Sequence, residues 1–349
     1  MSDGLGDAAA RMGRWQAWLD LGQETALDPE AAIVDPHHHL WDRGGHTYLP
    51  AQFAAEAQAS GHRVLASVYV ECLSHYLDSG PQALRPVGET AHVAALARAA
   101  WQVRESRGQP GGPEIAAGLI AFADLALGEG VDEVLDAHVR HADGRLRGIR
   151  YSTAHDSDPA IHSAYPTRAG MLREAAVQAG ASRLARRGLS LDVWVYFHQL
   201  GDVLALASAC PDLSIVIDHA GGPIGLGPYS GQRSQVLEQW RVQLQALSRA
   251  PNVSLKFGGL AMPLAGFEWR KRPRPPDSQT LAEAWRPYWE ICLDAFGPQR
   301  CMFESNFPVD RSGCTYGALW NAFQRLAAPL SVHERHQALA ATAQRVYRL

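Results

Sequence analysis

The chain has 349 residues, of which 46% are hydrophobic and 19% charged, so it can bury a large globular core. Its formal net charge of -4 at pH 7 excludes a general electrostatic attraction to nucleic acid or to anionic lipid. No apolar stretch is long enough to cross a bilayer, and no basic segment followed by an apolar one marks a secretory signal. Five cysteines without paired spacing fit reduced thiols, so we expect a cytoplasmic protein.

Residues 8–20 predict a short amphipathic helix within an N-terminal extension, residues 1–31. Beyond it, apolar β-type runs alternate with helix-period segments, which indicates βα units and a parallel sheet. The predicted strands are Ala32–His37, Val64–Val70, Ala116–Phe122, Leu146–Tyr151, Leu189–Phe197, Leu213–Ile217, Val253–Phe257 and Cys301–Glu304. The predicted helices are Thr90–Arg107, Val131–His141, Arg168–Arg187, Val203–Cys210, Ser234–Ala250, Leu281–Phe296 and Tyr316–Ala327.

Eight such units match the size of a closed (β/α)₈ barrel, a TIM barrel, so we expect one α/β barrel domain over residues 1–349. An open doubly wound sheet is the competing fold, but no Gly-x-Gly-x-x-Gly follows a strand. Trp269–Pro276 and Ser157–Thr167 are predicted as long loops, the first of them at the barrel mouth.

The first predicted strand ends in three consecutive histidines. Side chains alternate along a strand, so His37 and His39 face the same way while His38 points elsewhere. Two imidazoles on one face can bind one metal ion through their ring nitrogens. The alternative is a polar loop whose histidines are satisfied by hydrogen bonds, but three in a row at a strand end favour a functional site.

Two more histidines follow predicted strands. The fifth strand runs into His198, and the sixth ends in Asp218-His219 before two glycines. Either histidine alone is more often a core or capping residue. Together with the first pair, however, they place four imidazoles at three strand ends, where they can surround one metal ion or one polarised carbonyl. Neutral imidazole also moves protons near neutral pH, so the cluster suits hydrolysis or proton transfer.

Three charged residues near strand ends are weaker candidates for binding substrate. Glu71 can orient a histidine, contact substrate, or be a solvated loop carboxylate. Arg150 suits a bidentate clamp on a substrate carboxylate, with surface pairing as the alternative. Lys256 lies inside a strand, so its ammonium needs an internal partner or a substrate.

The eighth strand places Glu304 and Asn306 on one face. Asn306 is expected opposite the pair His37 and His39, where a group that activates water belongs. An amide has no basicity, although its oxygen can ligate a metal or accept a hydrogen bond. Either Glu304 or His219 must then take the proton.

The chain resembles the amidohydrolase superfamily, in the amidohydrolase-2 branch that holds sugar-lactone and pyrone-dicarboxylate lactonases. The motifs are Asp-Pro-His-His-His-Leu-Trp-Asp, Val-Gly-Glu-Thr, Leu-Arg-Gly-Ile-Arg, Asp-His-Ala-Gly-Gly-Pro and Met-Phe-Glu-Ser-Asn-Phe-Pro-Val-Asp, with the closing Ala-Gln-Arg-Val-Tyr-Arg-Leu. They span nearly the whole chain, and the first is the most specific. The resemblance implies a distorted (β/α)₈ barrel of the metal-dependent hydrolase type.

The resemblance also implies one divalent metal ion, often zinc, on His37, His39, His198 and His219. The superfamily usually has an aspartate as base where this chain has Asn306, and some lactonases of the branch work without a metal. The departure at Asn306 therefore leaves open which residue acts as base and whether a metal is required.

The first hypothesis is a hydrolase that opens a lactone or another cyclic ester of a small-molecule substrate. A metal, or the pair His37 and His39, polarises the carbonyl; His219 or Glu304 acts as base; and Arg150 holds an anionic group. The second is a metal-dependent non-oxidative decarboxylase or hydratase of a carboxylated ring or dienoate. The third is a binding protein with a decayed site, against which the intact histidine set argues. The sequence identifies neither the substrate nor whether the chain forms a homo-oligomer.

Overall fold

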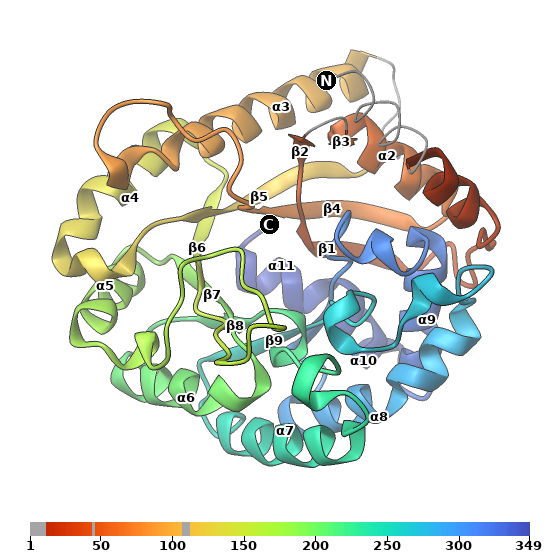
Figure 1. Cartoon of the computed structure of the whole chain (residues 1–349). Helices are drawn as coiled ribbons and strands as arrows, with labels where there is room; N and C mark the ends of the chain where they lie inside the picture. The colour runs from red at the N-terminus through yellow and green to blue at the C-terminus, as the bar shows by residue number, and fades with distance from the viewer. Residues whose placement is uncertain (1–11, 44–45, 107–111) are drawn as a thin grey trace, which may run out of the picture.

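The computed structural model describes residues 12–43, 46–106 and 112–349. Its main sheet has eight parallel strands in the order β1-β4-β5-β6-β7-β8-β9-β10, and helices surround this sheet as a ring (Figure 1). The strands of the main sheet are β1 (Ala32–His38), β4 (Arg63–Val70), β5 (Glu114–Phe122), β6 (Leu146–Ser152), β7 (Ser190–Trp194), β8 (Ile215–Ile217), β9 (Val253–Phe257) and β10 (Cys301–Phe303). A small antiparallel hairpin, β2 (Trp41–Arg43) and β3 (His46–Tyr48), follows β1.

Most helices lie between consecutive strands of the barrel, as a parallel sheet requires. They are α2 (Pro50–Ala59), α3 (Val87–Ser106), α4 (Val131–His141), α5 (Ala175–Arg186), α6 (Leu200–Ala209), α7 (Arg233–Leu247), α8 (Ser278–Phe296), α9 (Tyr316–Ala327), α10 (Val332–His336) and α11 (Thr342–Tyr347). None of the described helices is both long enough and apolar enough to span a bilayer.

The sheet closes into a (β/α)₈ barrel through the segment that follows β10. His38 forms an isolated parallel bridge with Phe307, and the His39 amide donates to the Phe307 carbonyl at 2.8 Å. Asp35 in β1 accepts from the Ser305 amide at 2.9 Å. These bonds bring the end of the eighth barrel strand against the histidine segment at the end of the first.

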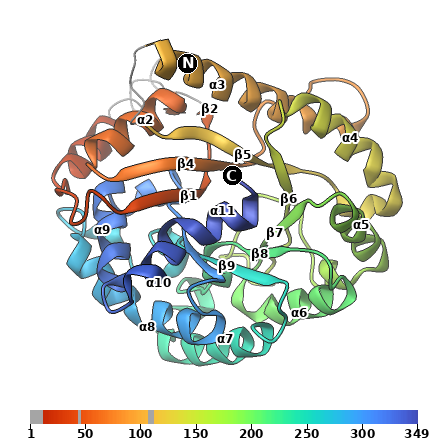
Figure 2. The ribbon, with the colours of Figure 1, turned by 180° about the vertical axis from the view of Figure 1, so that it is seen from behind.

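The inner face of the barrel is apolar at the amino ends of the strands. Val34, Val216 and Met302 pack there with Val346 and Tyr347 of α11. Seen from behind, α10 and α11 lie across the barrel, on the side away from the strands' carboxyl ends (Figure 2). The carboxyl ends are thereby left as the open side, where the polar residues gather.

The sequence predicted the main strands and most of the helices. β9, α4 and α9 have the predicted bounds. Residues 12–20 are helical as expected, whereas residues 8–11 of that prediction lie outside the described residues. The hairpin, α2 and the C-terminal helices were not predicted. All five cysteines are buried and unpaired, as expected for reduced thiols.

One predicted strand is too long, with consequences for the site. β7 ends at Trp194, and the chain turns into a 3-10 turn at Phe197–Gln199 instead of continuing to Phe197 as a strand. The Gln199 side chain fixes the turn, because its oxygen accepts from the Tyr196 amide at 3.1 Å and its amide donates to the Thr153 carbonyl at 2.8 Å.

Candidate active site

His37 and His39 extend from the end of β1 to the same side, as expected. Their Nε2 atoms lie 3.3 Å apart, and both side chains are buried. The His39 Nδ1 atom lies 2.7 Å from the Val70 carbonyl, which can only accept, so Nδ1 carries the proton. The Nε2 atom of neutral His39 therefore keeps its lone pair, directed at His37.

His219 follows β8 and has a carboxylate behind it. Its Nδ1 lies 2.7 Å from Glu304 Oε1, which also accepts from the His219 amide at 2.9 Å. A carboxylate can only accept, so Nδ1 is the protonated nitrogen and Nε2 is free to take a proton or a metal ion. The ring of His219 packs against that of His37, with centroids 4.5 Å apart.

Two glycines after β9 make room for this pair. A Cβ atom on Gly258 would lie 2.4 Å from Glu304 Cγ, and one on Gly259 would lie 2.5 Å from His219 Cβ. Gly259 also has φ +72°, a conformation that favours glycine. His219 itself has φ 52°, and strained backbone of this kind gathers at functional sites.

His37 lies between a donor and an acceptor. Its Nδ1 is 3.2 Å from Lys256 Nζ and 3.0 Å from Glu304 Oε2. Lys256 can only donate, so Nδ1 of neutral His37 accepts from it, and the His37 proton lies on Nε2, directed at His39. Burial lowers the pKa of His37 to about 4 and that of His219 to about 3, so both imidazoles are neutral at pH 7.

Beneath the histidines lies a buried ionic network. Lys256 Nζ donates to Asp192 Oδ2 at 2.6 Å and to Asp218 Oδ1 at 3.1 Å. Tyr347 of α11 donates to the same Asp192 oxygen at 2.7 Å. Burial alone would raise the pKa of Asp218, but the charges of Lys256 and Arg150 help to hold it well below the usual range. This network holds Lys256 in place beneath His37.

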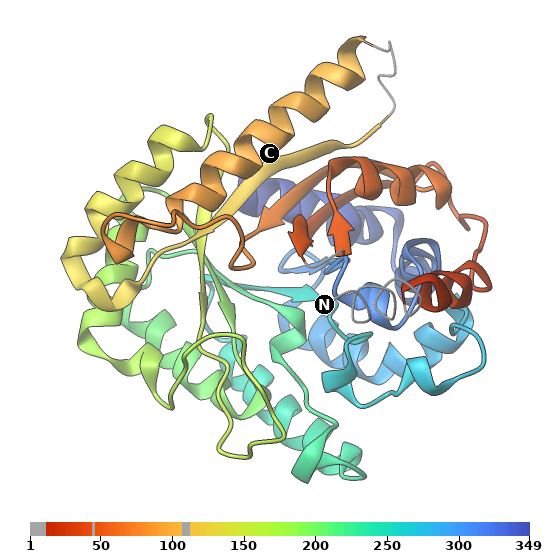
Figure 3. The same ribbon diagram turned by 45° about the horizontal axis from the view of Figure 1, so that its top comes forward.

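Glu71 and Arg150 meet at the barrel mouth. Arg150 Nε donates to Asp218 Oδ2 at 3.0 Å, and its Nη1 lies 3.7 Å from Glu71 Oε1. Tyr165, in the segment between β6 and α5, donates to Glu71 Oε1 at 2.5 Å. Burial raises the pKa of Glu71 to about 7, opposed by the charge of Arg150. The segment between β6 and α5, which carries Tyr165, projects from the barrel (Figure 3).

Asn306 is tied to the first strand but its amide oxygen is free. Its backbone amide donates to the His37 carbonyl at 2.8 Å, and Nδ2 donates to Asp310 Oδ2 at 2.6 Å. Oδ1 is buried without a hydrogen-bond partner. Asp310, four residues on, is itself fully buried, and this burial raises its pKa well above the usual value.

The structure does not bring His198 to the cluster, which corrects its predicted role as a metal ligand. His198 lies in the turn after β7, where its Nε2 contacts the His155 carbonyl at 3.1 Å and its side chain is 35% exposed. The strand ends early, so its last residue Trp194 packs on His219 instead, with ring centroids 4.7 Å apart. The fifth barrel strand therefore supplies an indole to the site and no imidazole.

Lys256 has internal partners, one of the two alternatives that the sequence left open. Its side chain is fully buried beneath His37. The sequence analysis missed Asp192 and Asp218 as acceptors from Lys256, and Tyr347 as a donor to Asp192. Asp192 and Asp218 could have been found, since Asp192 lies in the apolar strand β7 and Asp218 directly follows β8, and an ionised side chain at such a buried position needs a cation. Tyr347 gave no such signal.

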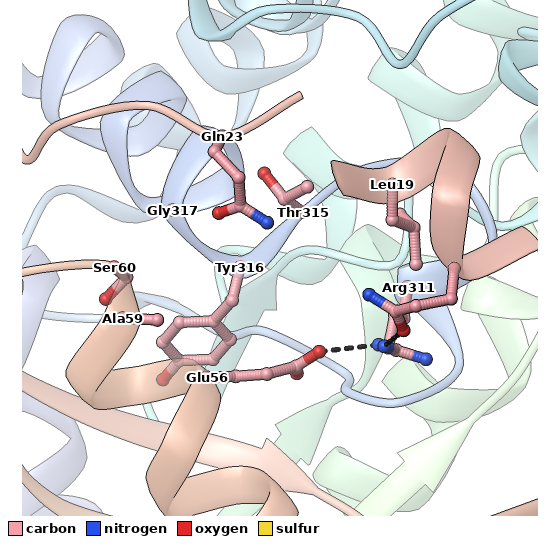
Figure 4. Close-up of a pocket in the computed structure, with 10 residues that line it drawn as sticks. Leu19, Gln23, Glu56, Ala59, Ser60, Arg311, Thr315, Tyr316 and Gly317 are labelled. Carbon is pink, nitrogen blue, oxygen red and sulfur yellow. Dashed lines mark hydrogen bonds and ion pairs between the residues drawn. The ribbon is translucent and has the colours of Figure 1, made fainter. Parts of the chain in front are cut away.

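A separate small pocket lies outside this cluster (Figure 4). The N-terminal helix, α2 and the start of α9 contribute to its lining, and Glu56 accepts from Arg311 Nε across it at 2.5 Å. It contains no histidine or cysteine. The Glu56–Arg311 ion pair connects elements outside the barrel and is not part of the histidine cluster.

Comparison with known proteins places the chain in a family. A family model described as Amidohydrolase matches residues 34–349. The chain therefore belongs to the amidohydrolase family, and it is a hydrolase.

Three similar proteins show how far the likeness extends. The chain is 31% identical over 340 residues to the uncharacterized protein y4mH of Sinorhizobium fredii, covering 92% of this chain and 99% of that one. It is 29% identical over 328 residues to the L-fucono-1,5-lactonase of Burkholderia multivorans, covering 91% and 97%. A crystal structure of an amidohydrolase from Burkholderia multivorans with bound zinc has a TM-score of 0.64 at 24% identity, covering 91% of this chain and 100% of that one. The last likeness confirms the barrel fold.

The family often uses a divalent ion, and the site fits one in part. Among the described residues, His37, Asp218 and His219 are the one group of three or more His, Cys, Asp or Glu side chains whose ligand atoms all lie within 4.8 Å of one another. However, Lys256 already occupies the space between Asp218 and His37 Nδ1 with a positive charge. The Nε2 pair of His37 and His39 fits better, because two nitrogens on a tetrahedral ion lie about 3.3 Å apart.

Proposed function

We propose that this chain hydrolyses a lactone or a related cyclic ester, with water attacking the carbonyl. The observation that carries the proposal is the His219–Glu304 pair, in which a neutral imidazole has Nδ1 held by a carboxylate at 2.7 Å. This is the arrangement of a general base whose imidazolium is stabilised from behind. The likeness to a protein named L-fucono-1,5-lactonase supports a lactone as substrate.

Each residue then has a part in the reaction. Nε2 of His219 takes a proton from the attacking water, and Glu304 stabilises the positive charge that forms on the ring. The proton is then given to the ring oxygen as the ester bond breaks. Asn306 Oδ1, buried and without a partner, accepts a hydrogen bond from the water and orients it, but takes no proton.

A divalent ion, for which we propose zinc, would be held by His37 and His39. The His37 proton would have to move from Nε2 to Nδ1, which lies 3.0 Å from Glu304 Oε2, to leave two Nε2 lone pairs 3.3 Å apart. When bound, such an ion polarises the lactone carbonyl as a Lewis acid. With His198 outside the cluster and bonded to the His155 carbonyl, we expect the ion to be held weakly.

The test is product analysis with a panel of sugar 1,5-lactones and carboxylated lactones. We expect the product to gain one water, and His219→Ala to lose nearly all turnover while keeping its melting temperature. A folded His219→Ala variant with most of the activity would contradict the proposal. Release of carbon dioxide from a carboxylated ring would instead support the decarboxylase alternative.

A further inference from the structure

We propose that Lys256 is a positioning residue that keeps the affinity of the histidine pair for a divalent ion low, because it holds the proton of His37 on the nitrogen that such an ion would bind. The inference rests on the proposed ion site at His37 and His39, and it does not depend on the substrate. The alternative is that Lys256 balances the charges of Asp192 and Asp218 and has no effect on His37.

A chain of hydrogen bonds runs from β9 to the end of β4 through the two histidines. Lys256 Nζ lies 3.2 Å from His37 Nδ1, and the two histidine Nε2 atoms lie 3.3 Å apart. At the other end, His39 Nδ1 lies 2.7 Å from the Val70 carbonyl. An ammonium can only donate and a carbonyl can only accept, so every bond of the chain donates in the same direction. His37 therefore donates from Nε2 to the Nε2 lone pair of His39.

Lys256 needs His37 as an acceptor. An ammonium has three N–H donors. One is used by Asp192 Oδ2 at 2.6 Å and a second by Asp218 Oδ1 at 3.1 Å. The lysine side chain is fully buried, and His37 Nδ1 is the partner of the third donor. A buried donor of a charged group is costly to leave unpaired, so this bond opposes any change that puts a proton on Nδ1.

Two carboxylates lie near His37 Nδ1 without taking its proton. Glu304 Oε2 is 3.0 Å away, yet this oxygen has no hydrogen-bond partner among the described residues. Asp218 Oδ1 is 3.4 Å away and accepts from Lys256. The acceptor that could stabilise the other tautomer of His37 is thus present, but the ammonium is the partner that Nδ1 has.

This arrangement is the reverse of what a metal-binding histidine needs. The ring nitrogen that faces away from an ion usually donates to a carboxylate or a carbonyl, and this bond leaves the other nitrogen free to ligate. His39 meets this condition through Val70, whereas His37 does not. An ion on the pair has to displace the proton between the two Nε2 atoms and deprive Lys256 of an acceptor. The charge of Lys256 also repels a second cation nearby.

The first experiment reads the tautomers directly, by ¹⁵N NMR of the histidine rings in wild-type protein that has been dialysed against a chelator. Protonated and unprotonated ring nitrogens have well separated shifts, and the signals are assigned by their loss in His37→Gln and His39→Gln. We expect the unprotonated nitrogen to be Nδ1 in His37 and Nε2 in His39. Charge balance without an effect on His37 predicts no such difference between the two rings.

The second experiment measures Zn²⁺ affinity by competition with a chromogenic chelator. In Asp192→Asn/Lys256→Met the ammonium is removed together with one carboxylate that it pairs with, so the net charge of the buried network stays the same. Glu304 Oε2 is then available to accept from His37 Nδ1. We expect the double variant to bind Zn²⁺ about 10- to 100-fold more tightly than wild type, the usual effect of a partner on the far nitrogen of a metal-binding histidine. Asp192→Asn alone keeps Lys256 and should bind Zn²⁺ no more tightly than wild type.

Two results would overturn the proposal: a proton on Nδ1 of His37 in metal-free wild type, or a folded double variant with the zinc affinity of wild type. If the double variant does not fold, the NMR result decides. Neither measurement uses a lactone, so a protein that hydrolyses no lactone would refute the proposed function and leave both tests of Lys256 in force.

Discussion

Replacing Glu304 by glutamine tests the base that we assign. The change keeps the shape of the side chain and removes its charge. Glu304 Oε1 accepts a hydrogen bond from His219 Nδ1, with the two atoms 2.7 Å apart. The carboxylate therefore stabilises the imidazolium that forms when Nε2 takes a proton from water. A hydrogen bond to a charged group contributes about 1.5–3 kcal/mol. At about 1.4 kcal/mol per factor of ten, kcat should fall roughly 10- to 100-fold.

The assay is steady-state hydrolysis of a hydroxylated 1,5-lactone, followed by acid release near neutral pH. KM should change little, because Glu304 is fully buried behind His219 and is not expected to touch the substrate. Glu56→Gln, a carboxylate that accepts two hydrogen bonds away from the barrel mouth, should leave kcat unchanged. A Glu304→Gln protein that is folded and has the kcat of wild type would refute the assignment of the base.

Three further predictions follow from particular contacts. Tyr347→Phe removes one donor from buried Asp192 and should lower the free energy of unfolding by about 1–3 kcal/mol together with kcat. The control Tyr48→Phe loses a hydrogen bond of the same length, 2.7 Å, and its kcat should equal that of wild type. Equal kcat in the two variants would contradict a role for α11 in the site. Burial raises the pKa of Glu71 to about 7, so if its ionised form binds substrate, kcat/KM should fall as the pH drops through about 7. Glu71→Gln should abolish this decrease of kcat/KM at low pH. A variant that keeps the decrease would assign it to another group. His198 lies outside the histidine cluster, so His198→Ala should keep the kcat and the metal content of wild type. Loss of both would show that His198 is a metal ligand after all.

The fold could be predicted from the sequence because it depends on local patterns. The apolar run Val253–Phe257 and the helix Val131–His141 have the bounds that their composition indicates. The fifth strand could not be bounded in this way. Val195 to Phe197 are as apolar as the strand before them, and the turn depends on the side chain of Gln199, which bonds to Thr153 across 46 positions.

The site was predictable to the extent that strand ends reveal it. His37, His39, His219 and Glu304 come together as the alternation of side chains and the barrel geometry require. The partners of these residues were not predictable. Tyr347 reaches Asp192 from 155 positions away, and only the packing of α11 inside the barrel shows the contact.

Hydrolysis in water labelled with heavy oxygen tests the central claim most directly, because it follows the attacking atom. If water attacks the carbonyl with His219 as base, one labelled oxygen appears in the carboxylate of the opened product, and the labelled product is nearly absent with His219→Ala. Label in the newly formed hydroxyl, or a product lighter by one carbon dioxide, would contradict the account.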